Sequence, residues 1–138
     1  MISITHSPID VSNIFENIND DKSIGATSIF LGSVRGHTEK KRSPVHAIYY
    51  EAYREMAEKI LSEIEEEAFS LWKITKFVAI HRIGYLNVND ISVVVAVSSA
   101  HRKESLEACK YGIENIKSRV PIWKKEISES GSSWIGGF

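Results

Sequence analysis

The chain has little cysteine and proline, and neither sign of charge is in clear excess. A single cysteine, Cys109, excludes an internal disulfide and cannot complete a thiolate zinc site. With 17 basic and 18 acidic residues, there is no basic excess to favour general nucleic-acid binding. No apolar run approaches the length of a transmembrane helix, and the first residues lack the features of a secretory signal. We therefore expect a cytoplasmic protein with no membrane or nucleic-acid partner.

The composition is that of a globular protein. The 138 residues are 43% hydrophobic and 25% charged, and they contain no repeat, linker or low-complexity stretch. We expect one α+β domain over residues 1–138, α/β-hammerhead-like, with a mixed or antiparallel sheet and three main helices. Residues from about 127 to 138 are expected to form a flexible tail.

Hydrophobic periodicity predicts the order of the elements. Strands are expected at residues 2–4, 24–34, 45–51, 74–80 and 91–97. Helices are expected after a Ser7 cap, across 56–71, and after Ser99 as far as Pro121, where proline disfavours helix. Residues 84–90 read as a connection, and residues from Ile122 onward as a tail. Two helices carry apolar stripes, at Val11, Ile14, Phe15 and Ile18, and at Leu106, Cys109, Ile113 and Ile116.

One candidate site lies where a β-branched strand passes into the third helix, at Ser98-Ser99-Ala100-His101-Arg102. Free N–H groups at a helix N-terminus attract anions, whereas cations there oppose the helix dipole. A phosphate between the amides and the side chains of His101 and Arg102 would remove that conflict. The alternative is that both side chains point into water.

Three further cations are candidates for a binding or catalytic role. Lys117 ends the third helix, where ordinary helix capping is the simpler interpretation, and Lys124 follows Trp123. A lysine beside apolar surface can instead act as a base or stabilise an oxyanion. Arg35 lies between Gly32 and Gly36, as either a phosphate ligand or a solvated loop residue.

Other reactive residue types give a plainer interpretation. Cys109 falls on an apolar stripe and is expected to be a buried core thiol. His81 and Arg82 are expected to be structural or interfacial. We expect no metal, because the histidines lack metal-ligand spacing: His6, His37, His46, His81 and His101.

Five segments form an ordered pattern that none carries alone. They are Phe30-Leu31-Gly32-Ser33-Val34-Arg35; Tyr50-Glu51-Ala52-Tyr53 with Met56-Ala57; Ile80-His81-Arg82-Ile83-Gly84; Ser98-Ser99-Ala100-His101-Arg102; and Lys117-Ser118-Arg119-Val120-Pro121-Ile122-Trp123-Lys124-Lys125-Glu126. In order and separation they resemble the large, catalytic subunits of molybdopterin synthase, the MoaE family. The resemblance runs from about Gly25 to Trp134.

The resemblance implies a sulfurtransferase of molybdenum cofactor biosynthesis. The family converts cyclic pyranopterin monophosphate to molybdopterin with two sulfurs from the thiocarboxylated C-terminus of a small ubiquitin-like subunit. That MoaD-like sulfur carrier inserts its Gly-Gly tail into the large subunit. Two large subunits form a central homodimer, with one small subunit at each end of a heterotetramer. No cofactor of the enzyme itself is implied.

The resemblance also assigns roles to individual residues. Lys117 matches the lysine beside the incoming glycine, and Lys124 matches the second catalytic lysine. His101 and Arg102 match a pair that holds the pterin phosphate. Arg35 matches an arginine thought to reach the site from the other protomer.

Two features and two alternative functions remain open. The loop from Thr38 to Pro44 is basic and lacks the glycine of many relatives, and the chain ends Gly136-Gly137-Phe138. One alternative is a non-catalytic module that binds the pterin or the small subunit without turnover. The other is RNA binding through Lys40-Lys41-Arg42, which no interleaved aromatic residues support.

Overall fold

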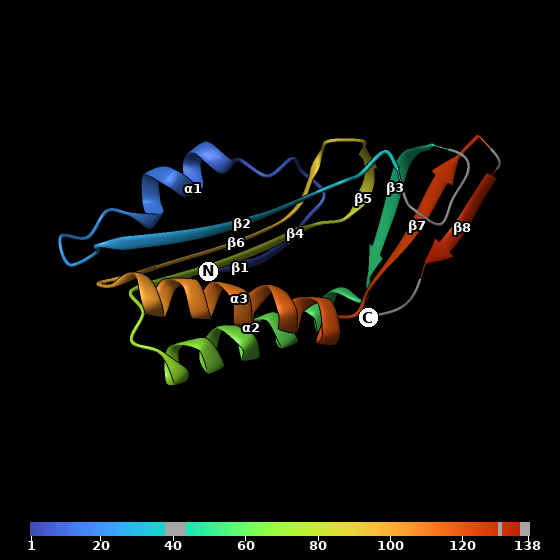
Figure 1. Ribbon diagram of the computed structural model, residues 1–138. Coiled ribbons are helices and arrows are strands. Elements are labelled where there is room, and N and C mark those ends of the chain that lie inside the picture. Colours follow the sequence, from blue (N-terminus) through green and yellow to red (C-terminus); the bar gives the residue numbers. More distant parts are fainter. Residues whose placement is uncertain (38–43, 130, 136–138) are drawn as a thin grey trace.

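The computed structural model describes residues 1–37, 44–129 and 131–135. Within these ranges, three helices and two four-stranded sheets form the protein (Figure 1). The expected α+β class and the three helices are therefore confirmed. Most of the basic loop, including Lys40-Lys41-Arg42, and the terminal Gly136-Gly137-Phe138 lie outside the described residues.

The first sheet is mixed and forms the centre of the molecule. Its strands lie in the order β1 (Ile2–Thr5), β4 (Lys76–Arg82), β6 (Ile91–Ser99) and β2 (Ala26–Ser33). β1 runs parallel to β4, and the other two pairings are antiparallel. Every residue of β6 after Ile91 is buried, because helices cover both faces of the sheet.

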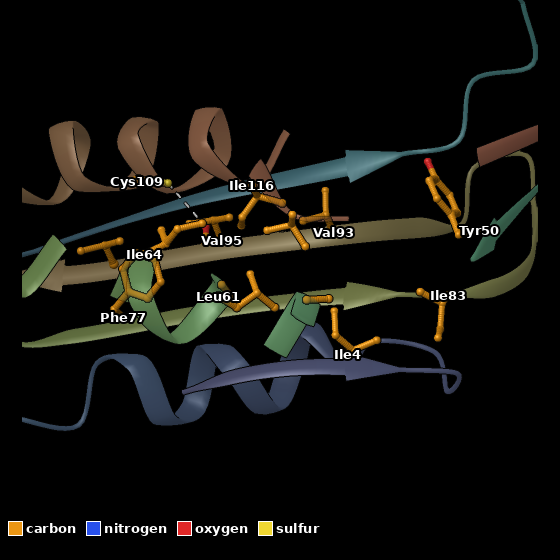
Figure 2. Close-up of a cluster of buried hydrophobic side chains, with 14 of the residues drawn as sticks. Ile4, Tyr50, Leu61, Ile64, Phe77, Ile83, Val93, Val95, Cys109 and Ile116 are labelled. Carbon is orange, nitrogen blue, oxygen red and sulfur yellow. Dashed lines mark hydrogen bonds between the residues drawn. The ribbon is translucent and has the colours of Figure 1, made fainter. Parts of the chain in front are cut away.

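Alternate residues of β6 point into two separate apolar clusters. Val94 and Ala96 pack against α1 (Val11–Ile18) on one face. The opposite face of β6 packs against α2 (Arg54–Leu71) and α3 (Arg102–Arg119) in the larger core. Figure 2 shows part of that core, with Tyr50 at the end of the sheet remote from Phe77.

The second sheet is antiparallel and extends beyond one end of the first (Figure 1). Its order is β5 (Gly84–Asn87), β3 (Val45–Ala52), β7 (Ile122–Ser128) and β8 (Gly131–Ile135). Three of these strands were not expected, because β5 was read as part of a connection and β7 and β8 as tail. The flexibility expected for residues 127–138 stays a prediction, although that stretch contains a strand.

Local details correct the expected helix ends and faces. The cap of α1 is Asp10 rather than Ser7, since Asp10 Oδ1 accepts a hydrogen bond from the amide of Asn13 at 3.0 Å. Phe15 and Leu106 are more than half exposed, so the buried stripes of their helices are narrower than expected. None of the helices in the described ranges is long and apolar enough to cross a membrane.

The expectation for Cys109 is confirmed. Its thiol lies in the larger core and contacts the carbonyl oxygen of Val95 at 3.5 Å (Figure 2). Burial raises the pKa of this thiol to about 11, so the nucleophilic thiolate is scarce at neutral pH.

Candidate active site

A pocket of about 200 Å³ lies where the C-terminal end of α3 meets the two sheets. We call it the lysine pocket. Its walls come from segments distant in the sequence: Phe30, Gly32, Ser33, Arg35, Val45, Ile48, Tyr50, Ser92, Lys117, Lys124 and Glu126. Three of the five predicted site residues, Arg35, Lys117 and Lys124, thus line one cavity.

The elements around the pocket explain how each cation arrives there. Lys117 lies in the last turn of α3, where a cation also interacts favourably with the helix dipole. Lys124 lies on β7 opposite Tyr50 of β3. Arg35 follows β2 directly after Val34, whose amide donates to the carbonyl of Asp90 at 3.0 Å.

The two lysines influence each other. The pKa of Lys117 lies below its ordinary value, chiefly because surrounding protein displaces water and secondly because Lys124 is also positive. Lys117 remains exposed as a whole residue, so the pocket wall desolvates only part of it. Such an amine can exchange a proton more readily than an ordinary lysine while its neighbour attracts an anion.

The pocket also contains buried polar residues that sequence reasoning missed. Tyr50, Ser92 and Glu126 are 7%, 3% and 5% exposed. The hydroxyl of Ser92 donates to the carbonyl of Gly32 at 3.2 Å, and burial raises the pKa of Tyr50. Glu126 was within reach of prediction, because residues two apart on a strand share a face and Lys124 lies two positions earlier.

His81 supports this wall from behind. Its ring packs edge to face against Tyr50, with centroids 5.1 Å apart, and its Nδ1 lies 2.8 Å from the carbonyl oxygen of Arg82. Burial lowers the pKa of His81 to about 4, so the imidazole adds no positive charge at neutral pH. The structural role expected for His81 agrees with this position.

The other two predicted site residues lie elsewhere. His101 and Arg102 are exposed at the N-terminal end of α3 and do not line the lysine pocket. His101 is the N-cap residue but makes no side-chain capping hydrogen bond. At 1.5 Å per residue, Lys117 lies roughly 22 Å farther along the helix axis. The five predicted residues therefore do not form one site within a single chain.

Arg35, in contrast, lies with the two lysines. It lines the pocket of its own chain together with both lysines, so no second protomer is needed to bring it there. The expectation that Arg35 reaches a site from the other protomer stays a prediction. Among the described residues, no group of three His, Cys, Asp or Glu side chains is arranged to hold a metal ion.

The fold and the pocket together define a class of protein. It is an α+β domain with a small cationic cavity, in which two lysines and an arginine can receive an anionic substrate. Residues 4–119 match the family model described as MoaE protein. The chain belongs to the MoaE family.

Individual relatives agree with that assignment. The molybdopterin synthase catalytic subunit of Bacillus subtilis is 44% identical over 133 residues, which are 96% of this chain and 83% of that protein. The crystal structure of molybdopterin synthase from Staphylococcus aureus superposes with a TM-score of 0.89 at 44% identity, covering 96% of this chain and 95% of that one.

A more distant structure shares the fold. It is a complex of subunits 1 and 2 of the molybdopterin-converting factor from Helicobacter pylori, with a TM-score of 0.79 at 20% identity. The match covers 96% of this chain and 88% of that chain.

Proposed function

We propose that the chain is the catalytic subunit of a molybdopterin synthase. In this proposal it is a sulfurtransferase that converts cyclic pyranopterin monophosphate to molybdopterin, using sulfur from the thiocarboxylated C-terminus of a small subunit. The observation that carries the proposal is the meeting of Arg35, Lys117 and Lys124 in one pocket. Family membership and the relatives' names agree with it.

The charge of the pocket suits both reactants. A thiocarboxylate and a phosphate ester are anions, and three cationic side chains face the cavity beside a single carboxylate, Glu126. Lys117 and Lys124 stabilise charge on the thiocarboxylate and on the opening pterin ring, or move protons between them. The lowered pKa of Lys117 makes it the better candidate for the proton-transferring lysine.

A separate sulfur donor is consistent with the chemistry of this chain. Its one cysteine, Cys109, is buried and holds its proton at neutral pH, so it is unsuited to carrying transferable sulfur. A Gly-Gly tail of a MoaD-like carrier has no side chains and therefore suits a pocket of about 200 Å³. The Helicobacter pylori relative was solved as a complex of two subunits.

We assign His101 and Arg102 to the phosphate of the pterin, but as residues of a second copy. They lie at the end of α3 remote from the lysine pocket of their own chain. We propose a twofold homodimer that brings the N-terminal end of α3 from one copy beside the pocket of the other, an arrangement that symmetry would repeat at both sites. Each site would then combine Arg35, Lys117 and Lys124 of one chain with His101 and Arg102 of its partner, and two carriers would complete a heterotetramer.

Reconstitution tests the proposed reaction. The purified chain is mixed with a thiocarboxylated small subunit and cyclic pyranopterin monophosphate, and molybdopterin is measured as its oxidised fluorescent derivative. We expect product that depends on all three components. A folded chain that binds the small subunit but yields no product would contradict the proposal and favour the non-catalytic binding module.

A further inference from the structure

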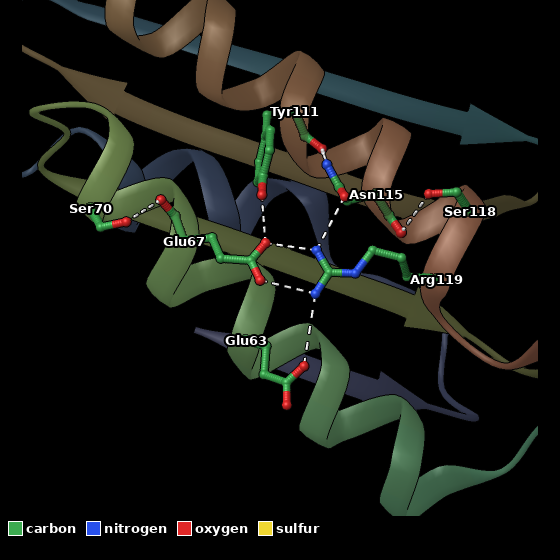
Figure 3. A network of polar contacts seen from close by, with 7 residues as sticks. All are labelled: Glu63, Glu67, Ser70, Tyr111, Asn115, Ser118 and Arg119. Carbon is green, nitrogen blue, oxygen red and sulfur yellow. Dashed lines mark hydrogen bonds and ion pairs between the residues drawn. The ribbon is translucent and has the colours of Figure 1, made fainter.

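A network of polar contacts outside the pocket joins α2 to the C-terminal half of α3 (Figure 3). Arg119 donates from Nη1 and Nη2 to the two carboxylate oxygens of Glu67, at 2.6 and 2.9 Å. Nη1 also donates to the side-chain oxygen of Asn115 at 3.1 Å, and the Tyr111 hydroxyl donates to Glu67. Glu63 adds a longer ion pair to Arg119 at 3.8 Å.

One member of this network, Arg119, lies in the segment that links the two pocket lysines. Arg119 is the last residue of α3, two positions after Lys117. The chain then turns at Pro121, whose carbonyl accepts from the amide of Tyr53 at 3.2 Å, and enters β7, which carries Lys124. An attachment at Arg119 therefore acts on the backbone between both lysines.

The direction of the side chains gives the attachment a specific effect. Residues two apart on a helix are about 200° apart around its axis, so Arg119 and Lys117 face nearly opposite ways. Arg119 binds Glu67 of α2 on one side of the last turn, and Lys117 lines the pocket on the other side. A bidentate arginine–carboxylate pair fixes distance and orientation together, so it restricts rotation of this turn.

The pair is poorly suited to a purely stabilising role. The side chains of Arg119 and Glu67 are 32% and 37% exposed, and ion pairs in contact with water contribute little to stability. Hydrogen bonds from Arg119 and then from Tyr111 hold the pKa of Glu67 at about 2, so the carboxylate keeps its charge at any neutral assay pH.

We propose that Arg119, clamped by Glu67, is a positioning residue that sets Lys117 relative to Lys124 in the lysine pocket. The expected effect on catalysis rests on the proposed function. The effect of Arg119 on the position of Lys117 does not. Misplacement of a catalytic group by about 1 Å can cost up to about 100-fold in rate. Loss of the clamp is therefore expected to reduce turnover more than substrate binding.

The kinetic test compares Arg119→Ala and Arg119→Lys with Lys110→Ala. The control removes an exposed ion pair on the same helix, in which Lys110 Nζ lies 3.9 Å from Glu114 Oε1. Neither residue lines the pocket. In the assembled synthase we expect kcat to fall about 10-fold in Arg119→Ala, with KM for the pterin within about 2-fold. Arg119→Lys keeps the charge without the fork and is expected to recover part of the loss, while the control matches the unmodified enzyme.

A second readout does not depend on product formation. NMR titration of isotope-labelled lysines follows the pKa of Lys117, which is lowered by its place in the pocket beside Lys124. We expect this pKa to rise toward its ordinary value in Arg119→Ala and to stay unchanged in Lys110→Ala. If the unmodified enzyme makes no product, the proposed function fails while this titration still tests the clamp.

An unchanged titration of Lys117 in a folded Arg119→Ala variant, or a kcat equal to that of Lys110→Ala, would overturn the proposal. Should Arg119→Ala not fold, Glu67→Gln serves in its place. Glu67→Gln keeps the shape of the side chain and removes the charge that orients Arg119. An unchanged titration of Lys117, or a kcat equal to that of Lys110→Ala, would overturn the proposal in this variant too.

Discussion

The two ends of α3 both carry cations, but the structure treats them differently. At the C-terminal end, Lys117 favours the helix dipole, lines the lysine pocket and lies in the same turn that Arg119 ties to α2. At the N-terminal end, His101 and Arg102 oppose the dipole and are exposed, and His101 makes no capping hydrogen bond. The chain itself therefore forms the cationic pocket at the C-terminal end. At the N-terminal end, a bound anion would offset the unfavourable interaction of the cations with the helix dipole.

The largest effect is expected from removing the cation at the C-terminal end. Lys117→Ala should lower kcat by about 100-fold or more, because stabilisation of developing charge is lost. Folding should be unaffected, since Lys117 is exposed. Product formation and circular dichroism check both points, with the exposed Lys59→Ala on α2 as control. Turnover near that of the control would remove Lys117 from the mechanism.

A smaller effect of another kind is expected at the N-terminal end. Arg102→Ala should raise KM for the pterin about 10-fold, equivalent to about 1.4 kcal/mol, and change kcat less. The reason is that a phosphate contact binds the substrate without taking part in the chemistry. Steady-state kinetics with the neighbouring exposed Lys103→Ala as control check this. An unchanged KM would show that this end of α3 does not meet the phosphate.

A buried histidine behind the pocket makes the stability of the protein depend on pH. His81, behind the pocket, has its pKa lowered by burial from the ordinary 6.5 to about 4. Between these values the unfolded imidazole binds a proton and the folded one does not, so acidification favours unfolding. The free energy of unfolding should fall by up to about 3 kcal/mol from this cause between pH 7 and 4.

Chemical denaturation across that pH range measures the effect. His81→Gln should flatten the pH dependence relative to the unmodified protein. Equal slopes for His81→Gln and the unmodified protein would argue against a neutral buried imidazole.

The smallest effect concerns the acid stability of the clamp. The pKa of Glu67 is lowered from 4.5 to about 2, so its stabilising contribution is complete above pH 4.5 and lost as the pH falls toward 2. Solvent screening limits it to under about 1 kcal/mol, because the carboxylate is partly exposed. Acid titration of stability should be flatter in Glu67→Gln than in the control Glu66→Gln. Identical curves would contradict this.

The sequence predicted the first sheet and the three helices better than the second sheet. β6 is an apolar run bounded by polar residues, and α2 repeats its apolar positions at helical spacing, so both were recognisable. β7 was missed because Lys124 and Glu126 on it face the pocket, which breaks the expected alternation of apolar inward residues. The polar residues of β7 that line the pocket are thus the reason that its sequence does not resemble a strand.

Local pattern also limited the prediction of the site. Position relative to the helix dipole marked His101 and Arg102 as unusual and Lys117 as ordinary, but it carries no information on which residues meet across the fold. Tyr50 and Ser92 gave no signal, since their role depends on the pairing of distant strands. Arg102 and Lys117 are separated by the length of one helix. The family resemblance assigns both to one site but does not say whether they belong to the same chain.

The central claim is that the two ends of α3 serve two different sites in a dimer. Mixing two separately impaired variants tests it most directly: Lys117→Ala and Arg102→Ala are unfolded and refolded together, then assayed at a pterin concentration well below KM, where both defects lower the rate. If sites combine residues from two copies, about a quarter of the sites in the mixture regain both residues, and activity rises well above either variant alone. Activity no higher than the average of the two separate variants would contradict the claim and return His101 and Arg102 to a role within their own chain.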